Sequence, residues 1–449
     1  MHELRSLDLF TGIGGFALAL KGICRPVAMC DLDPDAREVL RCRMIERRLE
    51  TCPVFDDVTA LKASDLPLAV DIIVGGWPCQ DLSALGLRRG LGGARSGLVR
   101  EVFRLMDETG AQGALLENVP RLLAPGNGFH DVLNAFVLER GFEVSWCVLS
   151  AGAVGAPHVR RRLYIWVRKP SFEHEFAEGA LHYQPYDWEH EPARMVGPDD
   201  TVVNHRNKRQ MLLGNSVVPD ALRSAFFVLA SGFRKAARPD GKGLRFESPC
   251  ENLLKEFPFE SLTDKKFEVP RWGHARKALS GDGIAVFAFA MPKLRTPELG
   301  LVLDPAAFFY DGPLQAPHAG MERSPRVTQA MALHSWSTPR SITCAARILS
   351  ERVSRDLPTQ VRFEKNTPNE MRDGQINTGF VEYLMGYPAN WTQLPSHWKT
   401  TAPVGYRPGQ IAKKKLQKEA DDAARLAKAT PRVVGENEVE GDEGEESDE

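Results

Sequence analysis

The stretch DLFTGIGGF, residues 8–16, follows a short apolar run and opens a segment with helical character. Its glycines, Gly12, Gly14 and Gly15, let the backbone turn tightly and come close to a ligand. About 20 residues later a second apolar run ends at Asp31, where a carboxylate can accept hydrogen bonds from ribose hydroxyls. The two features predict a site for a nucleoside-containing cofactor, while a plain strand-to-helix turn stays open for the glycine stretch alone.

The glycine stretch differs from two common nucleotide-binding motifs. It is not G-x-G-x-x-G, and it lacks the Lys-Ser/Thr pair that holds a triphosphate. The sequence therefore disfavours a dinucleotide dehydrogenase and a P-loop enzyme.

Residues 4–170 alternate between short apolar runs and helical patterns. The predicted strands are LRSLDLF (4–10), PVAMCDL (26–32), VDIIVGG (70–76), GALLENV (113–119), VSWCVLS (144–150) and RLYIWV (162–167). Helical patterns lie between them, such as PDAREVLRCRMIERRLE (34–50) and SGLVREVFRLMDETG (96–110). This alternation predicts an α/β fold with a doubly wound, Rossmann-like parallel sheet.

A change in composition divides the chain. Residues 1–235 form the alternating region, within which the polar, aromatic stretch 171–210 is predicted to be a loop insertion. In residues 236–400, short strand candidates are interrupted by many prolines and basic residues, which predicts a second, irregular and partly β domain. Residues 401–449 hold a basic helical segment and an acidic tail that is predicted to be disordered.

Composition limits where the chain works and what it binds. No window approaches the ~18 apolar residues of a membrane span, and the N-terminus lacks a secretory signal. We therefore expect a cytoplasmic protein, or a nuclear one in a eukaryotic host, with no membrane partner. The 8 cysteines include no CxxC pair, so no metal site is expected. The net charge is −2, but residues 434–449 contain 9 acids and no Lys or Arg; the rest is mildly basic, which is compatible with a nucleic-acid partner.

Cys79 needs an account separate from the other cysteines. It follows Pro78 at the end of the run VDIIVGG, and parallel sheets bind ligands at the carboxyl ends of their strands. The loop after it contains three arginines, including Arg88 and Arg95, whose charge would favour a thiolate or hold phosphates. For Cys79 alone, a packed cysteine beside a solvated basic loop is the simpler interpretation.

Two further motifs end at the same predicted edge of the sheet. Glu117 and Asn118 close the run GALLENV, so the carboxylate should reach the edge that carries Cys79 and, with a raised pKa, donate a proton. Arg160 and Arg162 are two apart before the last strand, a spacing that puts both guanidinium groups on one face of an extended chain. A surface glutamate and a solvated basic edge stay open for each motif in isolation.

Together these motifs resemble the cytosine-5 DNA methyltransferases over residues 4–233. The matched elements are DLFTGIGGF, the acidic DLD, DDVTAL, PCQ with the serine that follows it, ENV, the arginine motif, GNSVVP (214–219) and LMGYPANW (384–391). The resemblance implies an S-adenosylmethionine-dependent methyltransferase domain in residues 1–235. It also implies a target recognition domain in residues 236–400.

The resemblance also implies a role for each matched residue. Cys79 would be the nucleophile, Glu117 the partner of the target cytosine, and Arg160 and Arg162 the anchors of the base. The residues implied to surround S-adenosylmethionine are Phe10, Gly12, Gly14, Asp31, Asp57, Val58, Pro78, Asn215 and Ser216, with Asp31 on the ribose and Asp57 on the adenine amino group. The residues implied to bind DNA are Ser83, Arg88 and Arg95.

The implied reaction explains the residue types. Addition of the Cys79 thiolate to carbon 6 of cytosine lets carbon 5 take a methyl group from a sulfonium. A protonated Glu117 would hold ring nitrogen 3, and Arg162 would hold the carbonyl oxygen. A base then removes the proton at carbon 5, and the thiol is eliminated. Because a stacked duplex hides the target atom, the enzyme is expected to flip the cytosine out of a specific sequence of double-stranded DNA. The protein is also expected to be a monomer.

The sequence departs from the family pattern in two places. The arginine motif usually begins with Gln, but His158 stands there. The usual order places the recognition domain before GNSVVP, whereas here residues 236–400 and the LMGYPANW element follow it. Base-contacting residues therefore cannot be transferred from the family.

Other functions stay open at this stage. A tRNA cytosine-5 methyltransferase would share the core motifs, although the length of residues 236–400 favours DNA. A catalytically inactive homologue that binds DNA is a second alternative, against which the intact PCQ, ENV and arginine positions argue. An unrelated cofactor-binding oxidoreductase has little support. Restriction–modification, gene regulation and marking of a viral genome are all compatible with the sequence.

Overall fold

The computed structural model describes most of residues 3–231 and selected later segments. The described ranges are 3–78, 96–158, 160–172, 186–187, 189–196, 205–231, 234–237, 244–247, 260–261, 269–278, 283–287, 294–295, 302–303 and 374–398, with the single residues 339, 357 and 361. Met1–Thr400 form one compact unit. The basic segment and acidic tail expected in 401–449 lie outside the described residues.

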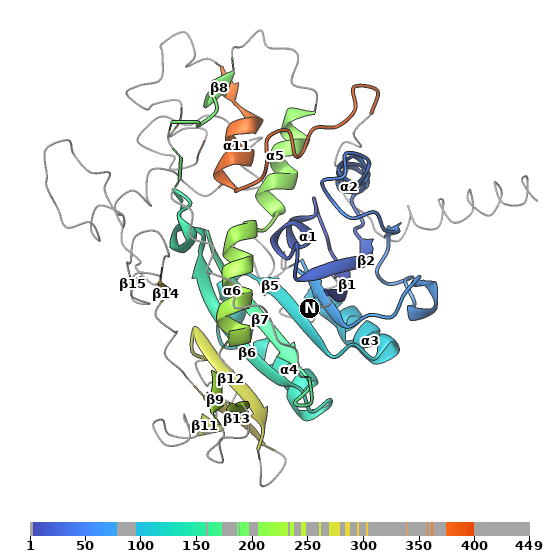
Figure 1. The fold of residues 1–449 in the computed structure, drawn as a ribbon, viewed down its shortest axis with the longest axis vertical. Helices are drawn as coiled ribbons and strands as arrows, with labels where there is room; N and C mark the ends of the chain where they lie inside the picture. Colours follow the sequence, from blue (N-terminus) through green and yellow to red (C-terminus); the bar gives the residue numbers. More distant parts are fainter. Residues whose placement is uncertain are drawn as a thin grey trace, which may run out of the picture. The chain divides into compact units, whose positions relative to one another are not determined.

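A ten-stranded mixed sheet organises the unit (Figure 1), in the order β11-β13-β12-β6-β7-β5-β4-β1-β2-β3. The first seven strands are Leu4–Leu9 (β1), Cys24–Cys30 (β2), Val54–Phe55 (β3), Ile72–Gly75 (β4), Gly113–Asn118 (β5), Glu143–Ser150 (β6) and Arg161–Arg168 (β7). β1 to β5 pair in parallel, in the order β3-β2-β1-β4-β5. Their carboxyl ends therefore meet along one edge of the sheet.

Helices cover both faces of this sheet. The described α-helices are Gly15–Ala19 (α1), Pro34–Ile45 (α2), Val99–Thr109 (α3), Phe129–Leu133 (α4), Arg206–Asn215 (α5), Pro219–Ser231 (α6) and Thr378–Leu384 (α11). One apolar core includes buried side chains of α1, α2, α6 and α11. A second core, on the other face, includes side chains of α3 and α4. Figure 1 shows α6 crossing β6 and β7.

The α/β fold and all six predicted strands are confirmed, with one difference in direction. β7 runs antiparallel to both β5 and β6. The connection from β6 to β7 is residues 151–160, which begin with the short turn Ala151–Val154. A parallel return needs a crossover of a dozen or more residues, so the short connection requires an antiparallel pair.

The stretch 171–210 differs from the predicted loop at its end. Residues 206–210 are the first half of α5, which ends at Asn215 within the GNSVVP motif. Earlier in the stretch, Met195–Val196 (β8) pairs with Gln375–Ile376 (β16). The insertion is therefore tied to the C-terminal part of the unit through a small sheet of its own.

Two described pieces of residues 236–400 join the α/β core. Trp272–Lys277 (β12) pairs antiparallel with β6, and Ile284–Phe287 (β13) and Glu260–Ser261 (β11) extend the sheet further. In the second piece, residues 374–398, Tyr387 and Trp391 are 3% and 1% exposed. A separate recognition domain in 236–400 thus stays a prediction, although these pieces pack with the core.

One helical stretch, Arg206–Ala230, is long and apolar enough to cross a membrane by length and composition. It comprises α5 and α6, and 83% of its apolar window is buried inside the protein. Its apolar side chains therefore serve the core of the unit.

Candidate active site

The glycine turn after β1 lies at the carboxyl edge of the sheet. Phe10, Gly12 and Gly14 have φ values of 53°, 57° and 84°, in the left-handed region that glycine adopts at little cost. The Gly12 N–H donates to Asp31 Oδ2 at 2.6 Å, and Asp31 Oδ1 accepts from the N–H of Asp33 at 2.8 Å. Asp31 therefore ties the glycine turn to the end of β2.

The turn is open on one side and packed on the other. A Cβ at Gly12 would meet no atom within 4 Å, whereas a Cβ at Gly14 would lie 2.9 Å from Leu49 Cδ1 and 3.0 Å from Leu40 Cδ2. The open side at Gly12 leaves room for a ligand. The packed side presses the turn against α2 and the loop that follows it.

Asp57 and Val58 follow β3 at the same edge. Asp57 Oδ1 accepts from the N–H and the hydroxyl of Thr59, at 2.9 and 2.7 Å, so it caps a local turn. Val58 is 7% exposed and belongs to the core that includes α3. Phe10 packs against the same core, so the expected cofactor residues of the first three strands lie along a common edge.

Burial raises the pKa of Asp31 to about 6, and the N–H donors of Asp33 and Gly12 offset part of that rise. Burial also raises the pKa of Asp8, two residues before Phe10, well above its usual value. Asp8 is fully buried at the end of β1. The glycine turn is thus flanked by two carboxyl groups that burial keeps from ionising easily.

The GNSVVP motif forms the turn between α5 and α6. Asn215 is exposed at the end of α5, and the buried Ser216 donates from Oγ to the Leu213 carbonyl at 2.8 Å. Arg160 donates from Nη2 to the carbonyls of Gly214 and Ser216, at 3.0 and 2.6 Å. The arginine motif therefore holds this turn in place.

Glu117 and Arg162 form an ion pair, with Arg162 Nε 2.7 Å from Glu117 Oε1. Their side chains are 13% and 20% exposed. Glu117 sits near the end of β5, and Arg162 near the start of the antiparallel β7, so both reach one edge. Burial raises the pKa of Glu117, and the cations of Arg162 and Arg160 lower it in part.

Cys79, Ser83, Arg88 and Arg95 lie outside the described residues, but the chain leading to Cys79 is described through Pro78. Asn118 Nδ2 donates to the carbonyl of Trp77 at 3.4 Å. A Cβ at Gly76 would lie 2.8 Å from Glu117 Oε2. The loop after β4 is therefore joined to the end of β5 just before the cysteine.

The two arginines of the motif make different contacts. Arg162 pairs with the carboxylate, whereas Arg160 is 4% exposed and donates to three backbone carbonyls, the third being that of Pro339 at 3.1 Å. The residues brought together are Gly12 with Asp31, Glu117 with Arg162, and Arg160 with Ser216. Among the described residues, no group of three or more His, Cys, Asp or Glu is arranged to hold a metal ion.

Sequence reasoning missed three contributors around this site. His158 Nε2 lies 2.9 Å from the Leu384 carbonyl. Tyr387 and Trp391 contact the GNSVVP turn and the glycine turn, respectively. The LMGYPANW match was the available signal for the aromatic pair, but a motif match does not say which backbone groups its side chains reach.

Comparisons with known proteins identify relatives of the chain. Residues 4–210 match the family model described as C-5 cytosine-specific DNA methylase. The chain is 29% identical over 368 residues to the Type II methyltransferase M.CviJI of Paramecium bursaria Chlorella virus IL3A, which covers 80% of this chain and 91% of that protein. It is 31% identical over 168 residues to the Type II methyltransferase M2.BsuMI of Bacillus subtilis (strain 168), which covers 36% and 41%.

Other relatives match shorter parts. The Type II methyltransferase M.HaeII of Haemophilus aegyptius is 29% identical over 207 residues, or 46% of this chain and 61% of that protein. The chain thus spans most of the viral relative and less than two thirds of the two bacterial ones. The solved S. pombe Dnmt2 methyltransferase aligns at 21% identity over 39% of this chain and 52% of that one, with a TM-score of 0.30, a likeness too distant to bear on function.

Proposed function

Because the chain belongs, through residues 4–210, to the C-5 cytosine-specific DNA methylase family, we propose that it transfers a methyl group from S-adenosylmethionine to carbon 5 of cytosine in DNA. The observation that carries the proposal is the ion pair between Glu117 and Arg162. It lies at the edge of the sheet where β4 ends, shortly before Cys79 in the sequence. An acid and a cation at the edge where the sequence leads us to expect the cysteine suit attack on an aromatic base.

The glycine turn fits S-adenosylmethionine. Gly12 leaves open space beside its Cα, and Asp31 keeps a carboxylate at the end of β2 for the ribose. Phe10, Gly14, Asp57, Val58, Pro78, Asn215 and Ser216 complete the proposed pocket. When bound, the cofactor supplies an electrophilic methyl group.

Cys79 would act as the nucleophile. Its thiolate adds to carbon 6 of cytosine, which makes carbon 5 electron-rich enough to accept the methyl group. After transfer, loss of the proton at carbon 5 and elimination of the thiolate restore the aromatic ring. Elimination thereby regenerates the free thiolate and releases the methylated base.

Glu117 and Arg162 would hold the cytosine. Because burial raises the pKa of Glu117, the side chain can carry a proton and donate it to ring nitrogen 3 as charge develops there. Arg162, now paired with Glu117, would donate to the carbonyl oxygen of the base. Arg160 would contribute indirectly, because it donates a hydrogen bond that holds the turn containing Ser216.

Double-stranded DNA is the proposed substrate, with the cytosine flipped out of the helix. Ser83, Arg88 and Arg95 would contact the DNA backbone in the loop after Cys79. The names of the relatives place them among Type II methyltransferases, so a role in restriction–modification follows for this chain as part of the proposal. The enzyme would act in the cytoplasm, or in the nucleus of a eukaryotic host.

Covalent trapping tests the proposal. The protein is incubated with S-adenosylmethionine and a mixed-sequence DNA duplex containing 5-fluorocytosine, whose fluorine cannot leave as a proton. Wild type should form a complex that survives a denaturing gel, and Cys79→Ser should not. Cys42→Ser, which removes a half-buried thiol on α2, is the matched control and should still form the complex.

The same experiment separates the alternatives. A wild-type complex with fluorinated tRNA but not with DNA would move the substrate to tRNA. Binding of DNA without any covalent complex or methyl transfer would indicate an inactive homologue and contradict the proposal.

A further inference from the structure

The C-terminal segment of residues 374–398 reaches the glycine turn of the cofactor pocket. Trp391 donates from its indole Nε1 to the carbonyl of Ile13 at 2.7 Å. Ile13 lies between Gly12 and Gly14, and both Ile13 and Trp391 are buried. A residue 378 positions away in the chain therefore supplies a hydrogen bond to the centre of the turn.

Tyr387 joins the same turn to the GNSVVP motif. Its hydroxyl donates to the carbonyl of Val217 at 3.1 Å. A Cβ at Gly15 would lie 2.4 Å from Tyr387 Oη, so the tyrosine packs directly against the turn. The rings of Tyr387 and Trp391 lie 5.8 Å apart, so the two side chains together connect the GNSVVP turn with the glycine turn.

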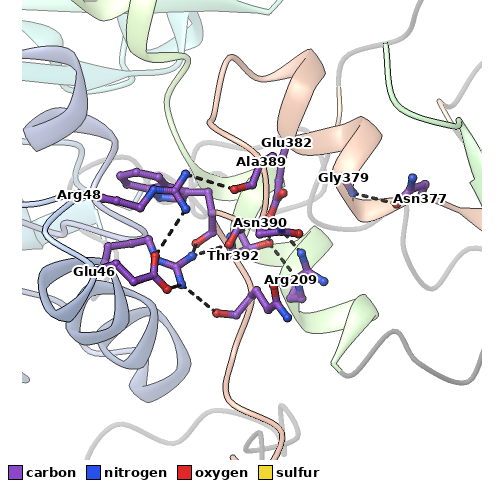
Figure 2. Close-up of polar contacts among 12 residues, drawn as sticks. Glu46, Arg48, Arg209, Asn377, Gly379, Glu382, Ala389, Asn390 and Thr392 are labelled. Carbon is purple, nitrogen blue, oxygen red and sulfur yellow. Dashed lines mark hydrogen bonds and ion pairs between the residues drawn. The ribbon is translucent and has the colours of Figure 1, made fainter. Parts of the chain in front are cut away.

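Arginines on α2 and in the turn after it fix Trp391 from the outer side. The guanidinium of Arg48 lies over the indole ring, 5.0 Å from its centroid, and donates to the Ala389 carbonyl at 3.2 Å. Arg43, 3% exposed, donates to the carbonyls of Asn390 and Trp391. Figure 2 shows Arg48 reaching Ala389 of the segment from the turn after α2.

A second polar cluster fixes the segment to α5. Arg209 donates to Glu382 Oε1 at 3.1 Å and to Thr392 Oγ1 at 2.9 Å. The N–H of Thr392 also donates to Glu382, at 2.7 Å (Figure 2). Because Glu382 and Thr392 are fully buried, these contacts cannot be exchanged for water and hold the segment in one position.

We propose that Trp391 is a positioning residue for the cofactor pocket, and this inference rests on the proposed function. Its indole N–H holds the Ile13 carbonyl and so keeps the glycine turn in the conformation that accepts S-adenosylmethionine. In that conformation Phe10, Gly12 and Gly14 have positive φ. Because Phe10 is not a glycine, such a backbone persists only where the surroundings fix it. In this rearranged chain, a segment at the end of the predicted recognition region, residues 374–398, thereby completes the pocket.

The variant Trp391→Phe tests the proposal. It keeps most of the apolar ring and removes the N–H, so the Ile13 carbonyl loses its donor. If only part of the population then holds the competent turn, the apparent affinity falls by that fraction. Calorimetric titration with S-adenosylmethionine should show a Kd about 5- to 30-fold higher than that of wild type. Turnover at saturating cofactor should change less than about threefold.

A second readout uses the ligand-free protein. Amide hydrogen exchange at residues 12–15 should be faster in Trp391→Phe, because the turn opens more often. Exchange in the central strand β4 should stay as in wild type. A purely stabilising tryptophan would instead raise exchange throughout the unit and leave the Kd unchanged.

Trp398→Phe is the matched control. Trp398 also donates its indole N–H, at 2.7 Å, but to Asp35 Oδ1 on α2 and not to the glycine turn. This variant loses the same chemical group from the same segment and should keep the wild-type Kd. If Trp391→Phe does not fold, Tyr387→Phe carries the test, since it removes the donor to Val217 and should raise the Kd as well.

The outcomes separate the inference from the proposed function. A wild-type Kd retained in both Trp391→Phe and Tyr387→Phe would overturn the positioning role and leave the methyltransferase proposal standing. Failure of the wild-type protein to bind S-adenosylmethionine would overturn both. An equal rise of Kd in Trp398→Phe would show a general effect of the segment and contradict a specific role for Trp391.

Discussion

Arg160 Nη2 lies 2.6 Å from the carbonyl oxygen of Ser216, 56 residues further along the chain. This bond joins the arginine motif to the GNSVVP turn, so a residue expected on the target base also fixes a wall of the proposed cofactor pocket. Arg160 reaches the Pro339 carbonyl as well, at 3.1 Å. One buried guanidinium thus spans the core and a residue of the 236–400 region.

Arg160→Lys should weaken the contacts that Arg160 makes with the GNSVVP turn and with Pro339. A lysine carries one compact ammonium and cannot reproduce the planar array of donors that Arg160 directs at separate carbonyls. We expect a loss of about 1–3 kcal/mol in the free energy of unfolding, because buried acceptors are left unpaired. Urea denaturation measures the loss, and titration should show weaker binding of S-adenosylmethionine.

Arg41→Lys is the control for this substitution. Arg41 has a side chain 49% exposed on α2 and a single long contact to Glu38, at 3.6 Å. Surface changes of this kind shift stability by less than about 0.5 kcal/mol. An Arg160→Lys protein as stable as Arg41→Lys would show that the carbonyl contacts contribute nothing.

Gly76→Ala should reduce activity without unfolding the protein. The added Cβ would lie 2.8 Å from Glu117 Oε2, and the end of a glutamate side chain can move aside. A displacement of about 1 Å at a reacting group can cost about 10²-fold in rate. We expect a loss of turnover of that order, measured with labelled S-adenosylmethionine, and a melting temperature close to that of wild type.

Two neighbouring substitutions calibrate this effect. Gly75→Ala would place a Cβ 2.1 Å from the Leu9 carbonyl oxygen, which is backbone and cannot move aside, so it should destabilise the pairing of β4 with β1. Gly283→Ala meets no atom within 4 Å and should be silent. Full activity in Gly76→Ala would argue against a catalytic place for Glu117.

Asp31 should make stability depend on pH. Burial raises its pKa from 3.8 to about 6, so between these values the folded protein binds more protons than the unfolded chain. The contribution of Asp31 is therefore fully present below about pH 4 and is lost as the pH rises through about 6, to an extent of about 1–3 kcal/mol. Urea denaturation at a series of pH values measures this slope.

Asp31→Asn removes the titration and supplies the comparison. As the pH rises from 4 to 6, wild type should lose free energy of unfolding relative to the variant. The variant should also bind S-adenosylmethionine more weakly, because an amide nitrogen cannot accept from Gly12 and a ribose. Parallel pH profiles for the two proteins would contradict the buried position of this carboxyl group.

The strands, and the edge of the sheet at which Glu117 and Asp31 lie, could be predicted from sequence. A buried strand such as Ile72–Gly75 or Gly113–Asn118 is an apolar run whose end is marked by a polar or glycine residue, and both signals are local. Residues that end neighbouring parallel strands meet at one edge. The placement of Glu117, Asp31 and the glycine turn along one edge therefore followed from topology.

Contacts between distant segments could not be predicted in the same way. The direction of β7 depends on the length of its connection, and α5 begins inside a stretch whose polar composition resembles a loop. The bond from Trp391 to Ile13 joins residues 378 positions apart, and no periodicity in either stretch indicates it. The partner of Arg160 depended on the placement of the GNSVVP turn in space.

His158, which replaces the usual glutamine of the arginine motif, gives the last prediction. It is fully buried, and its Nε2 lies 2.9 Å from the Leu384 carbonyl. Burial, together with the nearby cations of Arg160 and Arg162, lowers its pKa to about 4, although the hydrogen bond to Leu384 offsets part of that shift. The folded protein therefore holds His158 neutral, with the N–H directed at Leu384.

Because the unfolded chain protonates this histidine near pH 6.5, stability should fall as the pH drops from about 6.5 to 4, by about 2–3 kcal/mol. His158→Gln keeps a donor for Leu384 and cannot be protonated, so it should lose this acid sensitivity while retaining methyl transfer at pH 7.5. His397→Gln, at an exposed position of the C-terminal segment, should follow wild type at every pH. A His158→Gln protein that is as acid-sensitive as wild type would show that the histidine takes up its proton without cost, and that its burial against Leu384 does not hold in solution.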